Sequence, residues 1–395
     1  MNTAFEIAKR ISFQKQKTYT RFIVRLSIGA TAISVAAIIL TFSIVNGFQE
    51  SIASKVYSFW GQVRVSSING THMLRNETVE KKMMSVRPVQ TISPFITQST
   101  VLSYKQDIEG VNAKGIPNNE PSPFLIAGRN ITSNKDSISK EIILSKELAH
   151  KLNIPLGEDV RLYFLNNGAV QQRKLKLVGL FHSGIDDYDK QFVIVDLKLI
   201  QQLNQNNQQI EGYAITLKKE WNKEVAVNMI QKSLPANTVA STIDDYYPQI
   251  FDWIGVQTVN RNVTITIMLL IAIVNLLTCL FILMLERVNM IGTLTALGAS
   301  HQLLRKVFLY QASFISWTGI AIGCFVGLGL SFLQQFTGWI QLDETAYFMK
   351  ELPIHIIPSQ IVLIIVSTAA LSYISFLIPT LWIKKISPAQ TIRFD

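Results

Sequence analysis

Residues 286–311 read ERVNMIGTLTALGASHQLLRKVFLYQ and lie between two long apolar runs. The first half of this stretch carries apolar side chains at helical spacing, which predicts a short amphipathic helix. These side chains are Met290, Ile291, Leu294 and Leu297. Gly298 follows the last of them and predicts a sharp turn toward the next helix. Between two membrane spans, such a helix either lies in the lipid interface or docks into a groove on a soluble partner.

Apolar runs without Asp, Glu, Lys or Arg occur four times in the chain, and each is long enough to cross a bilayer. They cover residues 26–47, 263–285, 307–333 and 359–383. The first run follows a long basic leader and does not end in a small-x-small cleavage pattern, so it predicts a retained helix and not a signal peptide. With 48% hydrophobic and 16% charged side chains, the 395 residues predict a mixed membrane and soluble architecture.

The net charge of +10 is concentrated beside the apolar runs. Lys and Arg are in excess in residues 1–25, in the loop 286–306 and in the tail 384–395, which places these segments in the cytoplasm. This distribution is that of cytoplasmic flanks, so it excludes a nucleic-acid-binding surface. Residues 1–25 also have an amphipathic pattern. Because the basic segments lie in the cytoplasm, residues 48–262 and the short loop 334–358 must lie on the outer side of the membrane.

The outer segment 48–262 has a mixed pattern of helices and strands. Alternating apolar and polar residues predict strands at 62–66, 159–164, 174–181, 192–195 and 213–218. Ser145, Asp196 and Asn222 predict the N-caps of three helices between them. The fold class is therefore an α-helical membrane protein with four transmembrane helices and a large α/β domain inserted between helices 1 and 2. Residues 49–59 are expected to continue the first helix beyond the membrane.

Motifs for catalysis are missing from the printed sequence. It has no G-x-x-x-x-G-K-[ST] phosphate loop, and its five histidines lack metal-ligand spacing. Asp186, Asp187 and Asp189 lack the Gly and the distal Glu of a calcium loop, which favours a solvated turn. Cys279 and Cys324 fall in apolar runs and predict small core residues. We therefore expect no catalytic residue, no metal site and no cofactor in this chain.

The order E-R-x-x-x-I-G-x-L-x-A-L-G-A-S in residues 286–300 resembles the segment that FtsX-like ABC transporter permeases press against their ATPase. The wider pattern, with an FtsX-like permease domain at about 260–388, resembles the lipoprotein-releasing permeases LolC and LolE. Residues 143–149, 152–162 and 178–189 resemble pieces of the LolC/LolE outer domain in the same order. The ending of this chain differs from the family pattern at Gln390, where an acidic residue is usual.

The resemblance implies an inner-membrane permease subunit with cytoplasmic N- and C-termini. It implies an ABC ATPase of the LolD type that binds ATP and Mg, a second permease subunit that is identical or different, membrane lipids and lipoprotein substrates. Coupling to the ATPase is expected from Glu286, Arg287, Met290, Ile291, Gly292, Leu294, Leu297, Gly298 and Ala299. A path for lipid chains is expected at Ile38, Phe42, Met268 and Ile271.

Handover to a LolA-like periplasmic chaperone is a further expectation from the resemblance. LolC-type subunits carry a long hairpin as a hook for the chaperone. Here only residues 166–173 separate the two corresponding predicted strands, which suits a short turn around Asn167 and Gly168. This subunit is therefore expected to be closer to LolE in that feature, or to bind its chaperone by another surface.

Two other functions share the topology. A MacB-like efflux permease usually carries its ATPase domain in the same chain. An FtsX-like regulator of cell-wall hydrolases normally has a much smaller outer domain than residues 48–262. Both remain alternatives to lipoprotein release.

Overall fold

The computed structural model describes residues 18–118, 120–132, 137–166, 169–343, 347 and 349–381. The chain forms two compact units. The helical unit comprises Met1–Glu50, Ile254–Gln341 and Glu351–Asp395, and the sheet unit comprises Ser51–Trp253 and Leu342–Lys350. The amphipathic pattern predicted before residue 18 and the ending after residue 381 lie outside the described residues.

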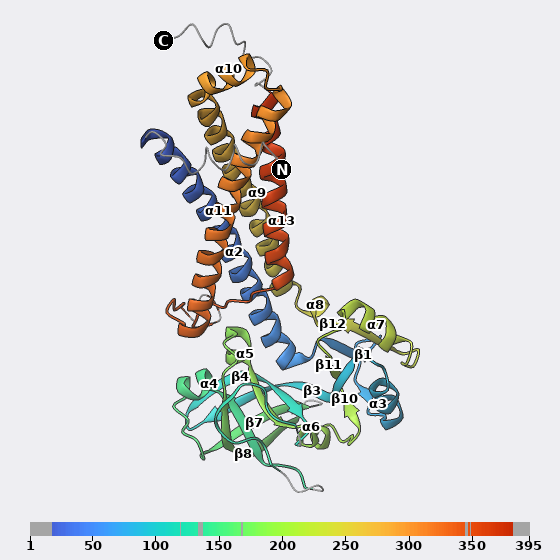
Figure 1. Cartoon of the computed structure of the whole chain (residues 1–395). Coiled ribbons are helices and arrows are strands. Elements are labelled where there is room, and N and C mark those ends of the chain that lie inside the picture. The colour runs from blue at the N-terminus through green and yellow to red at the C-terminus, as the bar shows by residue number, and fades with distance from the viewer. Residues whose placement is uncertain are drawn as a thin grey trace. The chain divides into compact units, whose positions relative to one another are not determined.

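Long helices dominate the helical unit. They are α2 (Thr18–Trp60), α9 (Pro248–Glu286), α11 (His301–Thr337) and α13 (Pro358–Leu381). Each contains a segment long and apolar enough to cross a membrane, which agrees with the four predicted spans. Helix α2 runs on to Trp60, as predicted for residues 49–59. Within this unit the helices lie side by side, and the short α10 (Val288–Ala296) joins α9 to α11 at one end (Figure 1).

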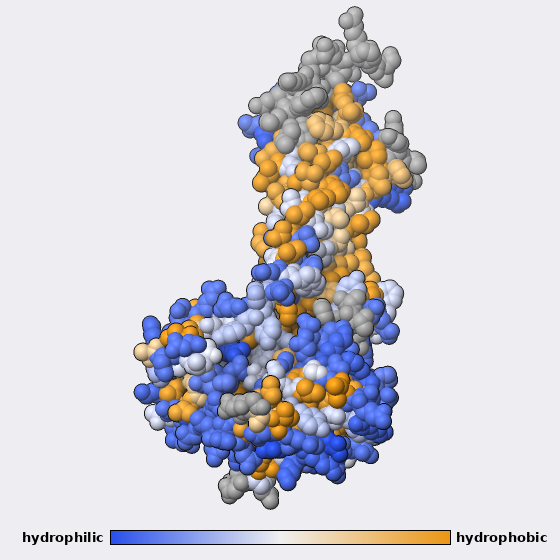
Figure 2. Space-filling view, turned by 180° about the vertical axis from the view of Figure 1, so that it is seen from behind, coloured by the Kyte–Doolittle hydropathy of each residue, from blue (hydrophilic) through white to orange (hydrophobic). Residues whose placement is uncertain are grey.

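Apolar side chains cover much of the visible surface of the helical unit (Figure 2). On α9 the exposed ones include Val263, Ile267, Leu270 and Val274. A surface of this kind is stable only against lipid or a partner protein, because water would make its exposure unfavourable. The visible face of the sheet unit is mainly polar, as expected of a domain in water.

Helices α2 and α11 approach each other at a stripe of small residues on α11. Gly319, Gly323 and Gly327 recur every fourth position and are buried against α2. A Cβ atom built on Gly323 would lie 2.6 Å from the carbonyl oxygen of Ala32 and 2.8 Å from Cβ of Val35. Such small residues let two membrane helices pack backbone to backbone, where dispersion contacts replace the missing hydrophobic drive.

The sheet unit is built on one ten-stranded sheet and a two-stranded ribbon. In chain order its strands follow α2 and precede α9. They are β1 (Val63–Ser67), β2 (Met73–Leu74), β3 (Val89–Tyr104), β4 (Asp107–Ile116), β5 (Leu125–Gly128), β6 (Glu141–Ser145), β7 (Asp159–Asn166), β8 (Ala169–Phe181), β9 (Phe192–Asp196), β10 (Gln209–Ile210), β11 (Gly212–Leu217) and β12 (Thr238–Thr242). The helices among them are α3 (Glu77–Met84), α4 (Lys146–Lys151), α5 (Asp186–Gln191), α6 (Leu197–Leu203), α7 (Lys223–Gln231) and α8 (Ile243–Tyr246).

Part of the large sheet closes into a barrel. Strands β3, β4, β9, β6, β8 and β7 pair in this order, and β7 pairs back with β3. Thr100 of β3 is accordingly opposite Val111 on one side and Phe164 on the other. Alternate residues from all these strands, such as Leu102 and Leu177, form one buried cluster. Because side chains alternate between the two faces of a strand, this cluster fills the barrel interior.

The predicted α/β class holds only in part, because the domain is rich in sheet and its ladders are mostly antiparallel. Only β4 with β9 and β6 with β8 pair in parallel among the described strands. The predicted caps are confirmed: the side chains of Ser145, Asp196 and Asn222 accept backbone N–H groups at the starts of α4, α6 and α7. Strand β8 begins at Ala169 and pairs with Asn166 of β7, so most of the predicted connection 166–173 is strand. Residues 167 and 168 lie outside the described residues.

The glycine stripe yields a test of the bundle. Gly323→Leu would push α11 from the backbone of α2, and overpacking of this kind costs about 1–3 kcal/mol. We therefore expect a lower unfolding temperature of the detergent-solubilised chain, followed by tryptophan fluorescence. Gly329→Leu is the matched control, because no atom of the described residues lies within 4 Å of a Cβ atom at Gly329 on the same helix. Equal stability of the two variants would refute the close contact.

Candidate functional site

The turn from α9 to α11 contains the segment that the sequence singles out. Helix α9 ends at Glu286, and the N–H of Arg287 donates to the Met284 carbonyl oxygen at 3.2 Å. Arg287 is the N-cap residue of α10, which ends at Ala296. Helix α11 begins after Ser300, whose hydroxyl accepts the Leu303 N–H at 3.3 Å. The predicted amphipathic helix is therefore present, as a short element fixed at both ends.

The apolar stripe of α10 divides into a buried and an exposed part. Ile291 is only 1% exposed and packs with Leu283 of α9 and Leu304 of α11 in the core of the bundle. Met290 and Leu294 are partly buried against the same core. Leu297, in contrast, is 84% exposed. Helical spacing alone does not distinguish a side chain that packs within its own chain from one that enters a partner's groove, and Ile291 packs within its own chain.

Gly298 closes α10 with a left-handed turn. Its φ of +92° is readily adopted only by glycine. The N–H of Gly298 donates to the Thr295 carbonyl at 3.0 Å, and that of Ala299 donates to the Leu294 carbonyl at 2.9 Å. This pair of bonds is a Schellman motif, and it satisfies carbonyl groups that the end of a helix leaves without partners. The turn predicted at Gly298 is confirmed.

The remaining expected coupling residues lie around this short helix. Gly292 is buried, Glu286 is exposed, and Arg287 and Ala299 are partly buried. Among the expected lipid-path residues, Ile38 is 2% exposed inside the packing of the bundle, and Ile271 is 48% exposed. Phe42 and Met268 are partly buried beside the core that contains Ile38.

Polar side chains that the sequence patterns did not predict join three spans near one end of the bundle. Asn46 of α2 donates from Nδ2 to Oε1 of Gln360 on α13 at 2.5 Å. Its Oδ1 accepts from Nη1 of Arg261 on α9 at 3.2 Å, and the guanidinium carbon lies 5.1 Å from the centroid of the Phe42 ring. The one indication in the sequence is that Asn46, Arg261 and Gln360 all lie at ends of apolar runs. A polar group costs less free energy there than at the centre of the membrane.

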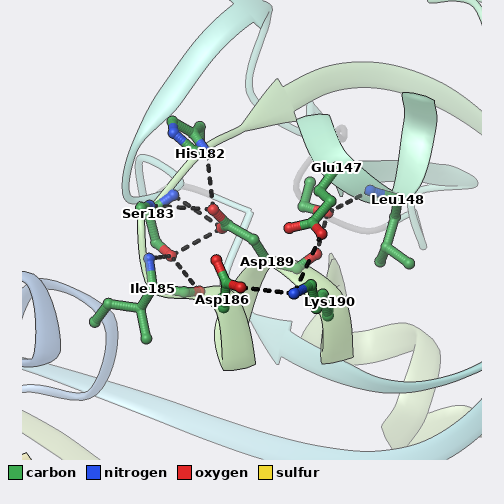
Figure 3. Close-up of polar contacts among 10 residues, drawn as sticks. Glu147, Leu148, His182, Ser183, Ile185, Asp186, Asp189 and Lys190 are labelled. Atoms are coloured by element: carbon green, nitrogen blue, oxygen red, sulfur yellow. Dashed lines mark hydrogen bonds and ion pairs between the residues drawn. The ribbon is translucent and has the colours of Figure 1, made fainter. Parts of the chain in front are cut away.

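In the sheet unit, a buried carboxylate organises the turn between β8 and α5 (Figure 3). Asp189 is 1% exposed. Its Oδ1 accepts the N–H of Ser183 at 2.9 Å and the Ser183 hydroxyl at 2.8 Å, and its Oδ2 accepts the N–H of Gly184 at 3.1 Å. Nδ1 of His182 lies 2.8 Å from Oδ2. The carboxylate thus replaces water as the partner of several polar groups in this turn.

The expectation of a solvated turn at the three aspartates is wrong for Asp189. Asp186 and Asp187 fit it better, because Asp186 pairs with Lys190 at 2.6 Å and Asp187 is exposed. The three residues begin helix α5, where carboxylates are favoured by the helix dipole. Among the described residues no group of three or more His, Cys, Asp or Glu side chains is arranged to hold a metal ion.

Comparison with known families assigns the chain to a class. A model of the MacB-like periplasmic core domain matches residues 26–233, and a model of the FtsX-like permease C-terminal domain matches residues 262–388. The chain therefore belongs to the family of ABC transporter permeases that combine a MacB-like periplasmic core domain with an FtsX-like permease domain.

Three relatives match this chain over nearly its whole length. The chain is 22% identical to the lipoprotein-releasing system transmembrane protein LolC of Neisseria meningitidis, over 97% of this chain and 96% of the relative. It is 24% identical to LolC of Buchnera aphidicola subsp. Schizaphis graminum, over 95% and 94%. It is 21% identical to LolE of Haemophilus influenzae, over 99% of both chains. The resemblance to LolC and LolE is thus confirmed, and it extends over nearly the whole chain.

Removing the carboxylate of Asp189 tests its structural role. Asp189→Ala leaves the buried N–H groups of Ser183 and Gly184 without partners, each at a cost of about 1–3 kcal/mol. We expect a clear loss of stability in urea unfolding of the solubilised chain. Asp187→Ala removes an exposed neighbour and is expected to change stability by less than about 0.5 kcal/mol. Unchanged stability of the Asp189→Ala variant in urea would show that the turn does not need this carboxylate.

Proposed function

We propose that this chain is the membrane-spanning subunit of an ABC transporter in which a partner ATPase drives the release of lipoproteins from the inner membrane. The similarity to LolC and LolE over nearly the whole chain supports the substrate class. The observation that carries the coupling step is α10, which presents an exposed Leu297 while its opposite side is built into the bundle. ATP and Mg would be bound by the partner subunit.

Helix α10 has the mechanical properties that coupling requires. A load on α10 passes to α9 and α11 through Ile291, because a close-packed core deforms little. Leu297 offers a large apolar side chain at the tip, and such side chains anchor protein interfaces when a partner supplies a pocket. The Schellman turn at Gly298 fixes the direction in which Leu297 is presented. Ile291 and Gly292 thus act through packing, whereas Leu297 contacts the ATPase.

The same proposal gives roles to the other residues expected to take part in coupling and in the lipid path. Glu286 and Arg287 flank the contact with the ATPase, and Met290, Leu294 and Ala299 support it. Of the expected lipid path, Ile271, Phe42 and Met268 remain, whereas the burial of Ile38 removes it from a lipid-facing surface. A second permease, identical to this chain or different, completes the path. The ladder of β7 and β8 reaches Asn166 and Ala169, which leaves little room for a long hook and favours another surface for a chaperone.

Two variants at the end of α10 test the coupling role. Leu297→Arg places a charge in the proposed apolar contact and is expected to reduce recovery of the ATPase in pull-downs by tenfold or more, corresponding to about 1.4 kcal/mol or more. Gly298→Val strains a backbone with φ of +92° and misdirects Leu297 without preventing insertion. ATP turnover of the reconstituted complex should fall in both.

Leu297→Met is the matched control, because it keeps an apolar side chain of similar volume. Normal expression with normal ATPase recovery and turnover in both test variants would remove the coupling assignment. A lipid-interface role of α10 predicts the opposite pattern, with little effect of Gly298→Val. The protein that co-purifies in mild detergent separates the functions: an ATPase with lipoprotein supports release, whereas an ATPase with a cell-wall hydrolase supports the FtsX-like alternative.

Topology provides a second test of the proposal. In a background in which Cys279 and Cys324 are replaced by Ser, single cysteines at Asn207 and at Asn166 are expected to react with an impermeant maleimide from the outer side. Cysteines at His301 and Asp395 are expected to react only from the cytoplasm, because the Lys and Arg excess flanks those segments. Reaction of the Asn207 position only from the cytoplasm would contradict an inner-membrane protein with cytoplasmic termini.

A further inference from the structure

The sheet unit contains a cavity of about 940 Å³ that the proposed transport cycle does not use. It lies between the last turns of α2, helix α3 and strands β3, β4 and β11. Its apolar lining includes Met84, Ile92, Phe95 and Ile116. Cavities that take small ligands measure about 300–1,000 Å³ and have this kind of apolar wall with a few polar groups.

A buried lysine lines this cavity. Lys114 follows Ala113 on β4, so it points to the outer face of the barrel, and it is only 4% exposed. Its Nζ donates to the carbonyl oxygen of Phe59 near the C-terminal end of α2. Nζ also lies 4.1 Å from the ring centroid of Phe59 and 4.2 Å from that of Trp60. Ring faces and a helix C-terminus both favour a cation here.

Among the described residues no carboxylate lies within ion-pair distance of Lys114; Glu120 and Glu211 act on it only at longer range, and burial lowers the pKa of its ammonium group to about 7. A buried charge of this kind is costly until an anion reaches it, so the site favours a ligand that brings one.

The carboxylates that act on Lys114 have other partners. Glu211 pairs with Arg64 and accepts the N–H of Thr97 at 2.8 Å. Glu120 accepts a hydrogen bond from the Ser93 hydroxyl, and burial raises the pKa of its carboxyl group. Glu80 pairs with Arg75 at 2.8 Å, so its charge is already compensated. The cavity thus combines an apolar wall with a buried lysine that forms no ion pair with a described carboxylate.

We propose that this cavity binds a single-chain anionic amphiphile of the fatty-acid type, with its carboxylate on Lys114 and its hydrocarbon chain along the wall formed by Ile92, Phe95 and Ile116. The cation selects the anionic head by charge, and the wall accepts the chain by the hydrophobic effect. The site is independent of α10 and of ATP, so its failure would leave the proposed transport function untouched.

The test uses the full chain in phosphatidylcholine nanodiscs and a palmitate that carries a photoreactive diazirine. After irradiation, mass spectrometry is expected to find adducts on peptides from α3, β3 and β4. Unlabelled palmitate should abolish them, whereas 1-hexadecanol, which has the same chain without the charge, should compete at least about tenfold more weakly. Equal competition by the alcohol, or adducts confined to the membrane helices, would overturn the proposal.

Variants separate the binding role of Lys114 from its packing role. Lys114→Met is expected to lower the adducts at least about tenfold, whereas Lys219→Met, at an exposed position outside the cavity, leaves them unchanged. Because Lys114 also contacts the end of α2, a second variant retains it: Ile92→Trp fills the cavity and should abolish labelling with an unchanged unfolding temperature. Wild-type labelling in a folded Lys114→Met or in Ile92→Trp would refute the site.

Discussion

Contact of α2 with each of the other three spans is the constraint on which the helical unit depends. Lipid chains are as apolar as the surfaces of membrane helices, so the hydrophobic effect does not drive these helices together. Their association therefore needs close packing and hydrogen bonds. Helix α2 meets α11 through Gly319, Gly323 and Gly327, and it meets α9 and α13 through Asn46. These contacts differ in kind. Dispersion between backbones acts at the glycine stripe, whereas a polar group that is costly to leave unpaired acts at Asn46.

The core of the bundle also holds α10 in place. A nine-residue helix is too short to be stable alone, so its structure depends on the core it joins. Ile291 supplies that core contact, and the Schellman turn supplies the partners that the last turn lacks. The exposed Leu297 is therefore held in place by buried groups of α10 and by the turn that follows it.

The sequence was informative where one local rule decides the structure. Absence of charge marked the spans, and Ser145, Asp196 and Asn222 marked helix starts, because these effects act within a few residues. Strand β3 is not among the predicted strands: its first half pairs with β11 and its second half with β4 and β7, so no single alternation runs through it. The burial of Asp189 depends on how the turn at Ser183 and Gly184 folds around its carboxylate, and that of Ile291 depends on its packing against two other helices. Local sequence patterns do not predict such contacts.

The barrel in the sheet unit has a consequence for how this unit opens. An open sheet can lose strands from its edges one ladder at a time, but β3, β4, β9, β6, β8 and β7 each have a neighbour on both sides. Freeing any of them breaks two ladders and exposes the shared interior, so opening becomes a cooperative event of high free energy. Backbone amides in this ring should consequently exchange their hydrogens with solvent as one slow group, while those of β12 and of the short ribbon β2–β10 exchange early and independently.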